Sequence, residues 1–177
     1  MSPRRLAVAL ASTAFLLLPS SVAAAQDVPA AAPSDDLLVA VVATAVEEGG
    51  GAPVITSLGA STDVFVAACK WAQVERYGTN IFGMKLWSYF QKIDWCYNGS
   101  TITSKTRTRW GETHFPGWSW KGHIGNSTSG GVGSTYFRAW TQGHFCLVEY
   151  FSCVQNAYPW IDMTVRGNGT WSWSAGG

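Results

Sequence analysis

Residues 84–110, MKLWSYFQKIDWCYNGSTITSKTRTRW, form two segments of alternating apolar and polar side chains joined by Asn98-Gly99. Alternation with a period of two places the apolar side chains of a β-strand on one face, and Asn-Gly is typical of a two-residue hairpin turn. Such a turn fixes the register, so Tyr97 is expected to face Ser100 and Trp95 to face Ile102. We therefore predict an antiparallel hairpin over these residues.

This register gives the hairpin two different faces. The face expected in the core carries apolar groups and one threonine: Trp87, Tyr89, Ile93, Trp95, Ile102, Thr106 and Trp110. The other face carries four cations among polar side chains: Lys92, Lys105, Arg107 and Arg109. These cations form a candidate anion-binding patch for a cell-wall phosphate or an acidic glycan, or else a solvated sheet face that tolerates like charges.

Similar short runs continue along the chain, separated by Gly- and Asn-rich turns about every ten residues. The predicted strands are 68–77, 84–96, 100–110, 117–122, 134–141, 144–151, 160–166 and 170–174, with loops at 77–80 and 125–131. The spacing of Phe82, Leu86, Tyr89 and Ile93 also fits a helix, although Gly83 and the β-forming neighbours favour a strand. The pattern predicts an all-β fold, an antiparallel β-sandwich or small barrel of about eight short strands.

The last hairpin has two possible registers. With a two-residue turn at Asn168-Gly169, Arg166 faces Trp171 and Thr164 faces Trp173. One face would then hold a candidate sugar-binding set in which indoles stack on sugar rings and polar groups bind hydroxyls: Trp160, Asp162, Arg166, Trp171 and Trp173. With one extra turn residue, Trp171 and Trp173 move to the core side instead.

The chain divides into three segments. Residues 1–25 are predicted to be a signal peptide, with Arg4 and Arg5, an apolar run over 6–19 and small residues at 23–25. Residues 26–61 have five acids and no Lys or Arg, which indicates an acidic flexible leader or pro-segment. Part of this segment could form a short helix that begins at Leu37 and is ended by the glycines at 49–51. Residues 62–177 form the expected secreted β domain, with ten Lys and Arg against six acids.

Composition narrows the classes of protein to which the chain can belong. With 177 residues, 47% hydrophobic and 13% charged, the chain is one globular domain with targeting segments, and a formal net charge of +1 disfavours nucleic acid as a partner. Its apolar runs are too short to span a membrane, so no transmembrane span is expected in the mature chain. All ten tryptophans lie between Trp71 and Trp173. Trp71 and Trp140 are expected to join the tryptophans of the first hairpin in the core.

The cysteines number four: Cys69, Cys96, Cys146 and Cys153. An even count in an exported chain predicts two disulfides. Three pairings are possible, of which Cys69–Cys96 and Cys146–Cys153 are favoured. No metal site is expected, because neither a Cys-x-x-Cys motif nor a spaced His pair is present.

Catalytic motifs of the serine, metalloprotease and phosphate-binding types are missing from the sequence, and no cofactor is expected. We therefore expect non-catalytic extracellular binding of a polysaccharide or cell-wall polymer. One alternative is a small secreted hydrolase, which needs two paired acids or a serine beside His123 or His144. Others are a secreted protein-interaction module, such as an inhibitor or toxin, and a protein whose tryptophans only pack the core. Trp118 and Trp120 fit either role.

The order of aromatic and cysteine motifs over residues 66–177 resembles a group of small secreted actinobacterial proteins. The motifs are Ala68-Cys69-Lys70, Trp95-Cys96-Tyr97-Asn98-Gly99, Pro116-Gly117-Trp118-Ser119, Gln142-Gly143-His144-Phe145-Cys146 and Tyr158-Pro159-Trp160. The resemblance implies export, a bacterial source and a β fold. It implies no activity and no functional residues.

Overall fold

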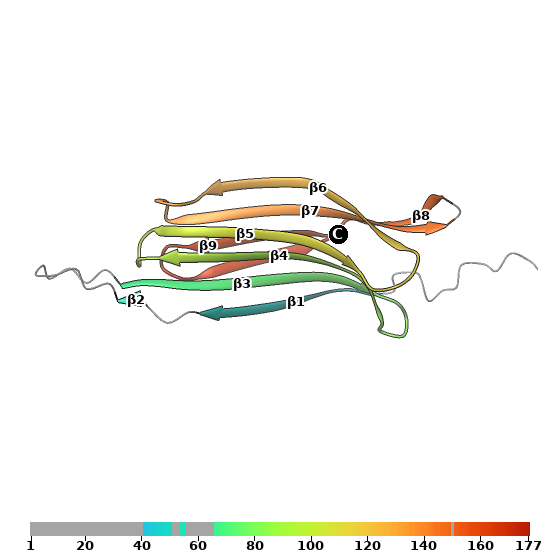
Figure 1. The fold of residues 1–177 in the computed structure, drawn as a ribbon, viewed down its shortest axis with the longest axis horizontal. Coiled ribbons are helices and arrows are strands. Elements are labelled where there is room, and N and C mark those ends of the chain that lie inside the picture. The colour runs from blue at the N-terminus through green and yellow to red at the C-terminus, as the bar shows by residue number, and fades with distance from the viewer. Residues whose placement is uncertain (1–40, 51–53, 56–65, 150) are drawn as a thin grey trace, which may run out of the picture. The chain divides into compact units, whose positions relative to one another are not determined.

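Two antiparallel sheets make up the part of the chain that the computed structural model describes, residues 41–50, 54–55, 66–149 and 151–177 (Figure 1). The first sheet has the order β1 (Val41–Gly50), β3 (Val66–Thr79), β4 (Lys85–Tyr97) and β5 (Ile102–Thr113), with β2 (Val54–Ile55) paired to β3. The second has the order β10 (Trp171–Gly176), β9 (Trp160–Arg166), β7 (Tyr136–Glu149) and β6 (Trp118–Gly130), with β8 (Ser152–Ala157) paired to β7. These ranges contain no helix.

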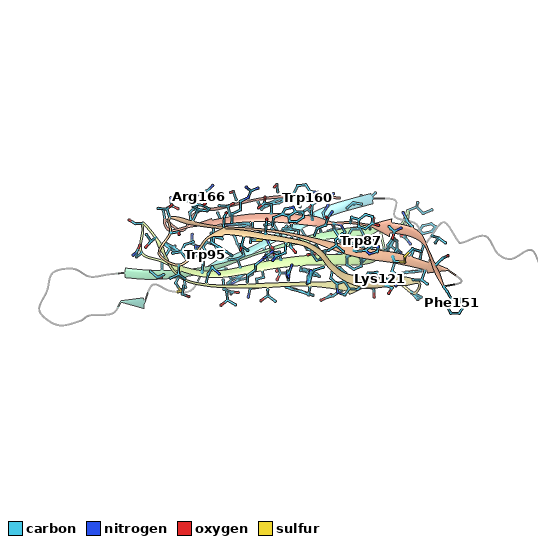
Figure 2. All side chains as sticks on the ribbon, turned by 90° about the horizontal axis from the view of Figure 1, so that it is seen from above. Trp87, Trp95, Lys121, Phe151, Trp160 and Arg166 are labelled. Carbon is cyan, nitrogen blue, oxygen red and sulfur yellow. A yellow bond between two sulfur atoms is a disulfide. The ribbon has the colours of Figure 1, made fainter. Side chains whose placement is uncertain are left out.

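The two sheets pack face to face as a β-sandwich, which confirms the predicted fold class. Among the described strands, each sheet ends in strands with one neighbour, β1 and β5 in one and β10 and β6 in the other, so these strands do not close a barrel. Alternate side chains of both sheets fill the core; Trp87 and Trp95 lie there as predicted (Figure 2). The Trp87 ring stacks on Phe145 of the other sheet, with ring centroids 5.0 Å apart. We call the core-facing side of each sheet its inner face and the opposite side its outer face.

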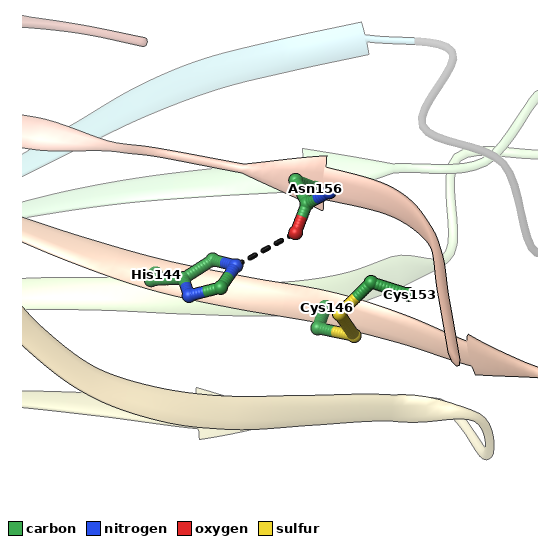
Figure 3. Close-up of a disulfide and its surroundings, with 4 residues drawn as sticks. All are labelled: His144, Cys146, Cys153 and Asn156. Carbon is green, nitrogen blue, oxygen red and sulfur yellow. Dashed lines mark hydrogen bonds between the residues drawn. A yellow bond between two sulfur atoms is a disulfide. The ribbon is translucent and has the colours of Figure 1, made fainter. Parts of the chain in front are cut away.

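Both favoured disulfides are present. Cys69 and Cys96 lie directly opposite each other on β3 and β4. Cys146 and Cys153 join β7 to β8, near His144 and Asn156 (Figure 3). Disulfides of this kind form in oxidising compartments, so they are consistent with an extracellular location.

The N-terminal part of the sandwich begins earlier than the sequence indicated. Val41–Gly50, assigned to the flexible or helical leader, is strand β1 and pairs with β3 over its whole length. Alternation is weak there because both faces of β1 carry small or aliphatic side chains over Val41–Val46 and one glutamate each at Glu47 and Glu48. The proposed signal peptide at 1–25 lies outside the described residues.

Other strand boundaries differ in detail. The helical interpretation of 82–93 is wrong, because Lys85–Tyr97 is an extended strand. The segments predicted as 134–141 and 144–151 form the single strand β7, and the expected loop at 125–131 is mostly the end of β6. Gly143 does not interrupt β7, because the Trp120 side chain occupies the space beside it.

Glycines opposite tryptophans explain much of the tryptophan content. Five indoles lie against glycines of neighbouring segments: Trp71 against Gly49, Trp87 against Gly78, Trp120 against Gly111 and Gly143, Trp140 against Gly125, and Trp160 against Gly176. A Cβ atom at any of these glycines would lie between 2.5 and 2.7 Å from the indole, closer than side chains can pack. The missing side chain therefore gives each flat ring its place on the sheet.

Candidate functional site

The first hairpin has a different register from the predicted one. Trp95 pairs with Lys105 instead of Ile102, a shift of three residues. The turn is longer than two residues, because the Asn98 side-chain oxygen accepts hydrogen bonds from the backbone N–H groups of Ser100 and Thr101. A bulge beside Tyr97 adds to the shift. An odd shift exchanges the two faces of β5 relative to β4.

This exchange divides the predicted anion-binding patch. Lys105, Arg107 and Arg109 pair with Trp95, Ile93 and Gln91, so they project from the inner face. Lys92 projects from the outer face. The prediction that all four cations share one face is therefore wrong.

On the outer face of the first sheet, neighbouring side chains pack against the aromatic rings. Lys92 Nζ lies 3.2 Å from the Asp94 carboxylate and 5.1 Å from the centroid of the Trp71 ring. Trp110, predicted in the core, stacks on Phe90 with centroids 4.6 Å apart. Stacking between Trp110 and Phe90 covers one face of each ring, and Lys92 covers a face of Trp71.

The last hairpin adopts the register with one extra turn residue. Trp171 pairs with Val165 and Trp173 with Met163, so both indoles lie on the inner side of the terminal strand β10. Trp171 packs against the core, and its indole N–H donates to the Glu48 carboxylate on β1. Trp173 remains 43% exposed. The predicted sugar-binding set is thus divided between the two faces.

Trp160, Asp162 and Arg166 all project from the outer face of the second sheet, along strand β9. Trp160 and Arg166 lie apart along that strand (Figure 2). Strand β7 adds Trp140 directly opposite Asp162, and Gln142 directly opposite Trp160. The expectation that Trp71 and Trp140 lie in the core is therefore wrong, because both project from outer faces. The signal that could have placed Trp140 on the outer face is alternation along the strand. Larger and polar side chains alternate there with smaller or apolar ones: Tyr136, Arg138, Trp140 and Gln142 with Phe137, Ala139, Thr141 and Gly143.

A carboxylate–guanidinium pair lies next to these two indoles on the same face. Arg138 Nη2 donates to Asp162 Oδ2 at 2.5 Å, and Nε is 3.0 and 3.1 Å from the two carboxylate oxygens. The hydrogen bond to Asp162 raises the pKa of Arg138 above its ordinary value. The pair fixes the Asp162 carboxylate, which leaves outward-facing N–H groups of Arg138 and lone pairs of Asp162 for a ligand.

We call this surface the platform face: Arg138, Trp140, Gln142, Trp160 and Asp162. Both indoles are half-buried, because one side of each lies over a glycine of the adjacent strand. A shallow hollow of about 280 Å³ adjoins it, lined by Arg138, Asp162, Thr164, Ser172, Trp173 and Ser174. Arg166 lines a separate hollow toward the Asn168 turn. Flat rings beside hydroxyl, amide and charged groups are suited to sugar binding.

The hydrolase alternative depends on which side chains contact the three histidines. Ser88 Oγ lies 2.8 Å from His114 Nε2 and 2.6 Å from Glu75 Oε1, but Ser88 is fully buried. The acid contacts the serine and not the histidine, unlike the order in a catalytic triad. His123 contacts the Tyr89 hydroxyl, and His144 Nε2 lies 2.7 Å from Asn156 Oδ1 (Figure 3).

Within the described ranges, no group of three His, Cys, Asp or Glu side chains could hold a metal ion. In the same ranges, no helix is long and apolar enough to cross a membrane.

Comparisons with protein families, with curated proteins and with solved structures find no match to the chain.

Proposed function

We propose that the protein is a secreted, non-catalytic binding protein whose platform face binds a polysaccharide. The observation that carries the proposal is the pair of half-buried indoles, Trp140 and Trp160, on the same outer face as the adjacent Arg138–Asp162 pair. The apolar face of a pyranose stacks on an indole, while carboxylate, guanidinium and amide groups bind its hydroxyls. The two disulfides support export.

The geometry of the platform face favours an extended ligand. Arg138 to Gln142 spans four residue steps of an extended strand, roughly 13 Å, which is long enough for two or three sugar rings. Ser172 and Ser174 of β10 border the same surface and add hydroxyl groups. Because the surface is open, it suits the middle of a polymer better than a chain end.

The binding test is affinity electrophoresis of the full chain through gels that contain a soluble polysaccharide, with a panel of β-glucans, xylans and cell-wall glycans. Trp160→Ala is expected to weaken binding at least tenfold, which corresponds to about 1.4 kcal/mol. Trp110→Ala is the matched control, because Trp110 is also half-buried on an outer face but stacks on Phe90. Asp162→Asn, which removes only the charge, is expected to weaken binding as well.

Thermal unfolding of each variant separates lost binding from lost folding. The proposal is wrong if no polysaccharide retards the wild-type protein. It is also wrong if Trp110→Ala weakens binding as much as Trp160→Ala while both variants stay folded.

Exposed apolar side chains favour protein interaction as a second candidate function. In the β3–β4 connection, Ile81 is 63% and Phe82 is 67% exposed. Phe151, between β7 and β8, is fully exposed and has a left-handed backbone with φ of 72°. Ile81→Ser with Phe82→Ser would abolish capture of a protein partner but leave polysaccharide retardation unchanged, whereas platform variants would do the reverse.

A further inference from the structure

A row of cations lies along the open edge of the sandwich between β5 and β6, the terminal strands of the two sheets. We call Lys105, Arg107 and Arg109 the basic ladder. Each reaches from the inner face of β5 to strand β7 of the other sheet. Lys105 Nζ lies 4.2 Å from the centroid of the Phe137 ring, Arg107 Nη2 donates to the Trp140 carbonyl at 3.1 Å, and Arg109 Nη1 donates to Thr141 Oγ1 at 3.2 Å.

The central guanidinium of the ladder is held by uncharged acceptors. Arg107 Nε and Nη2 donate to Gln91 Oε1 at 2.9 and 2.5 Å, and Nη1 donates to Asn126 Oδ1 at 2.6 Å. Burial, and then the charge of Arg109, lowers the pKa of Arg107 to about 10, so it is still cationic at neutral pH. The middle of the ladder is therefore a fixed positive charge in a partly buried place.

The acidic side chains of the described residues do not neutralise this charge. Their three ion pairs are Lys85–Glu75, Lys92–Asp94 and Arg138–Asp162. None includes a member of the ladder, and all three lie on outer faces. Two half-buried guanidinium groups and an ammonium group thus stand together without a carboxylate, which favours binding of an external anion.

The two end members of the ladder retain donors for such an anion. Among the described side chains, Arg109 uses only Nη1 and Lys105 contacts only the face of an aromatic ring. On β6, burial and then the charges of Arg109 and Arg107 lower the pKa of His123, which favours the neutral imidazole beside these guanidinium groups.

The spacing of the ladder suits repeated charges on one polymer. Lys105 and Arg109 are four residues apart on an extended strand, which places their Cα atoms about 14 Å apart. Single-stranded nucleic acids are bound by basic grooves that also carry stacking rings. Here the neighbouring ring of Phe137 is buried in the core. A ligand would be recognised through its charged groups alone.

We propose that the basic ladder binds the sulfate or phosphate ester groups of a linear polysaccharide, through Lys105 and Arg109. This site is separate from the platform face, which lies on the outer side of the second sheet and is proposed to bind neutral sugars. The two sites do not depend on each other.

The test measures the affinity of the full chain for heparin and for a phosphomannan by isothermal titration calorimetry at several salt concentrations. Single variants Lys105→Gln and Arg109→Gln are expected to weaken binding about tenfold each, and the double variant about a hundredfold. The slope of log affinity against log salt should become shallower by about two in the double variant. The matched control is Lys85→Gln with Lys92→Gln, which removes the same net charge from cations already paired with carboxylates.

Three results would overturn the proposal. One is that neither polymer binds at low salt. The second is that the control double variant weakens binding as much as the ladder variant, which would leave only net charge as the cause. The third is tighter binding of a single-stranded oligonucleotide than of heparin. Lys105 is exposed, so Lys105→Gln tests the site even if Arg109→Gln lowers stability.

The experiment also separates the two proposed sites. Trp160→Ala should leave heparin affinity unchanged, and the ladder variants should leave retardation by neutral polysaccharides unchanged. Loss of one activity without the other therefore shows which proposal has failed.

Discussion

Gly78→Ala tests whether glycines set the positions of the buried indoles. Gly78 on β3 pairs directly with Trp87 on β4, and both are buried. A Cβ atom at Gly78 would lie 2.7 Å from Cε2 of the indole and 2.8 Å from Cζ2, where ordinary contact begins at 3.4 Å. The ring would have to move by 3.4 − 2.7 Å, which is 0.7 Å. Stacking on Phe145 opposes that movement.

The cost of this clash follows from the general behaviour of overpacked cores. Forcing an extra carbon into a well-packed core costs about 1–3 kcal/mol. Replacing glycine by alanine within a strand returns roughly 0.5–1 kcal/mol of backbone entropy. We therefore expect Gly78→Ala to lower the free energy of unfolding by about 1–2 kcal/mol, measured by urea titration followed by tryptophan fluorescence.

Gly50→Ala is the matched control, because the nearest atom to its added Cβ is 3.8 Å away. It should be neutral or slightly stabilising. In a Trp87→Phe background the clashing indole atoms are gone, so Gly78→Ala should cost less there than in the wild type. Equal costs in both backgrounds, or a cost no larger than that of Gly50→Ala, would refute the reasoning.

Two further predictions concern the polar groups beside the basic ladder. His123 has a lowered pKa in the folded protein, mainly through burial, so the unfolded chain takes up its proton first. Stability should therefore fall as the pH drops below about 6.5. His123→Gln should reduce this loss between pH 7.5 and 5.5 in urea titrations, and an unchanged loss would exclude His123 as its source. Arg107→Met should cost about 1–3 kcal/mol, because the buried Gln91 side chain loses its donor. The double variant Arg107→Met with Gln91→Met should lower the free energy of unfolding by at least 1 kcal/mol less than the sum of the two single variants. Strictly additive losses would contradict the hydrogen bond between Arg107 and Gln91.

Alternation and turn residues were enough to predict an antiparallel sandwich, because they depend on neighbours in sequence. The register of the first hairpin was not predictable in the same way. Asn98-Gly99 fits a two-residue turn, yet the Asn98 side chain instead caps a longer one. An odd error in register then assigned Trp110 to the core and the cations of β5 to the wrong face.

The candidate site was predictable where it lies within one strand. Trp160, Asp162 and Arg166 share a face because even numbers of residues separate them along one strand, whatever the turn does. The basic ladder was not predictable, because Gln91 and the Trp140 carbonyl meet Arg107 only when the two sheets pack. The sequence shows which residues are cations. Which acceptors they contact depends on how the two sheets pack.

Strand β1 also sets a limit on how the protein can mature. It covers β3 through ten paired residues from Val41 to Gly50. A protease that cut after residue 50 would release this strand, open the hydrogen-bonding edge of β3 and remove Gly49 from beneath the Trp71 ring. Any processing that preserves this pairing must therefore leave Val41–Gly50 attached to the domain.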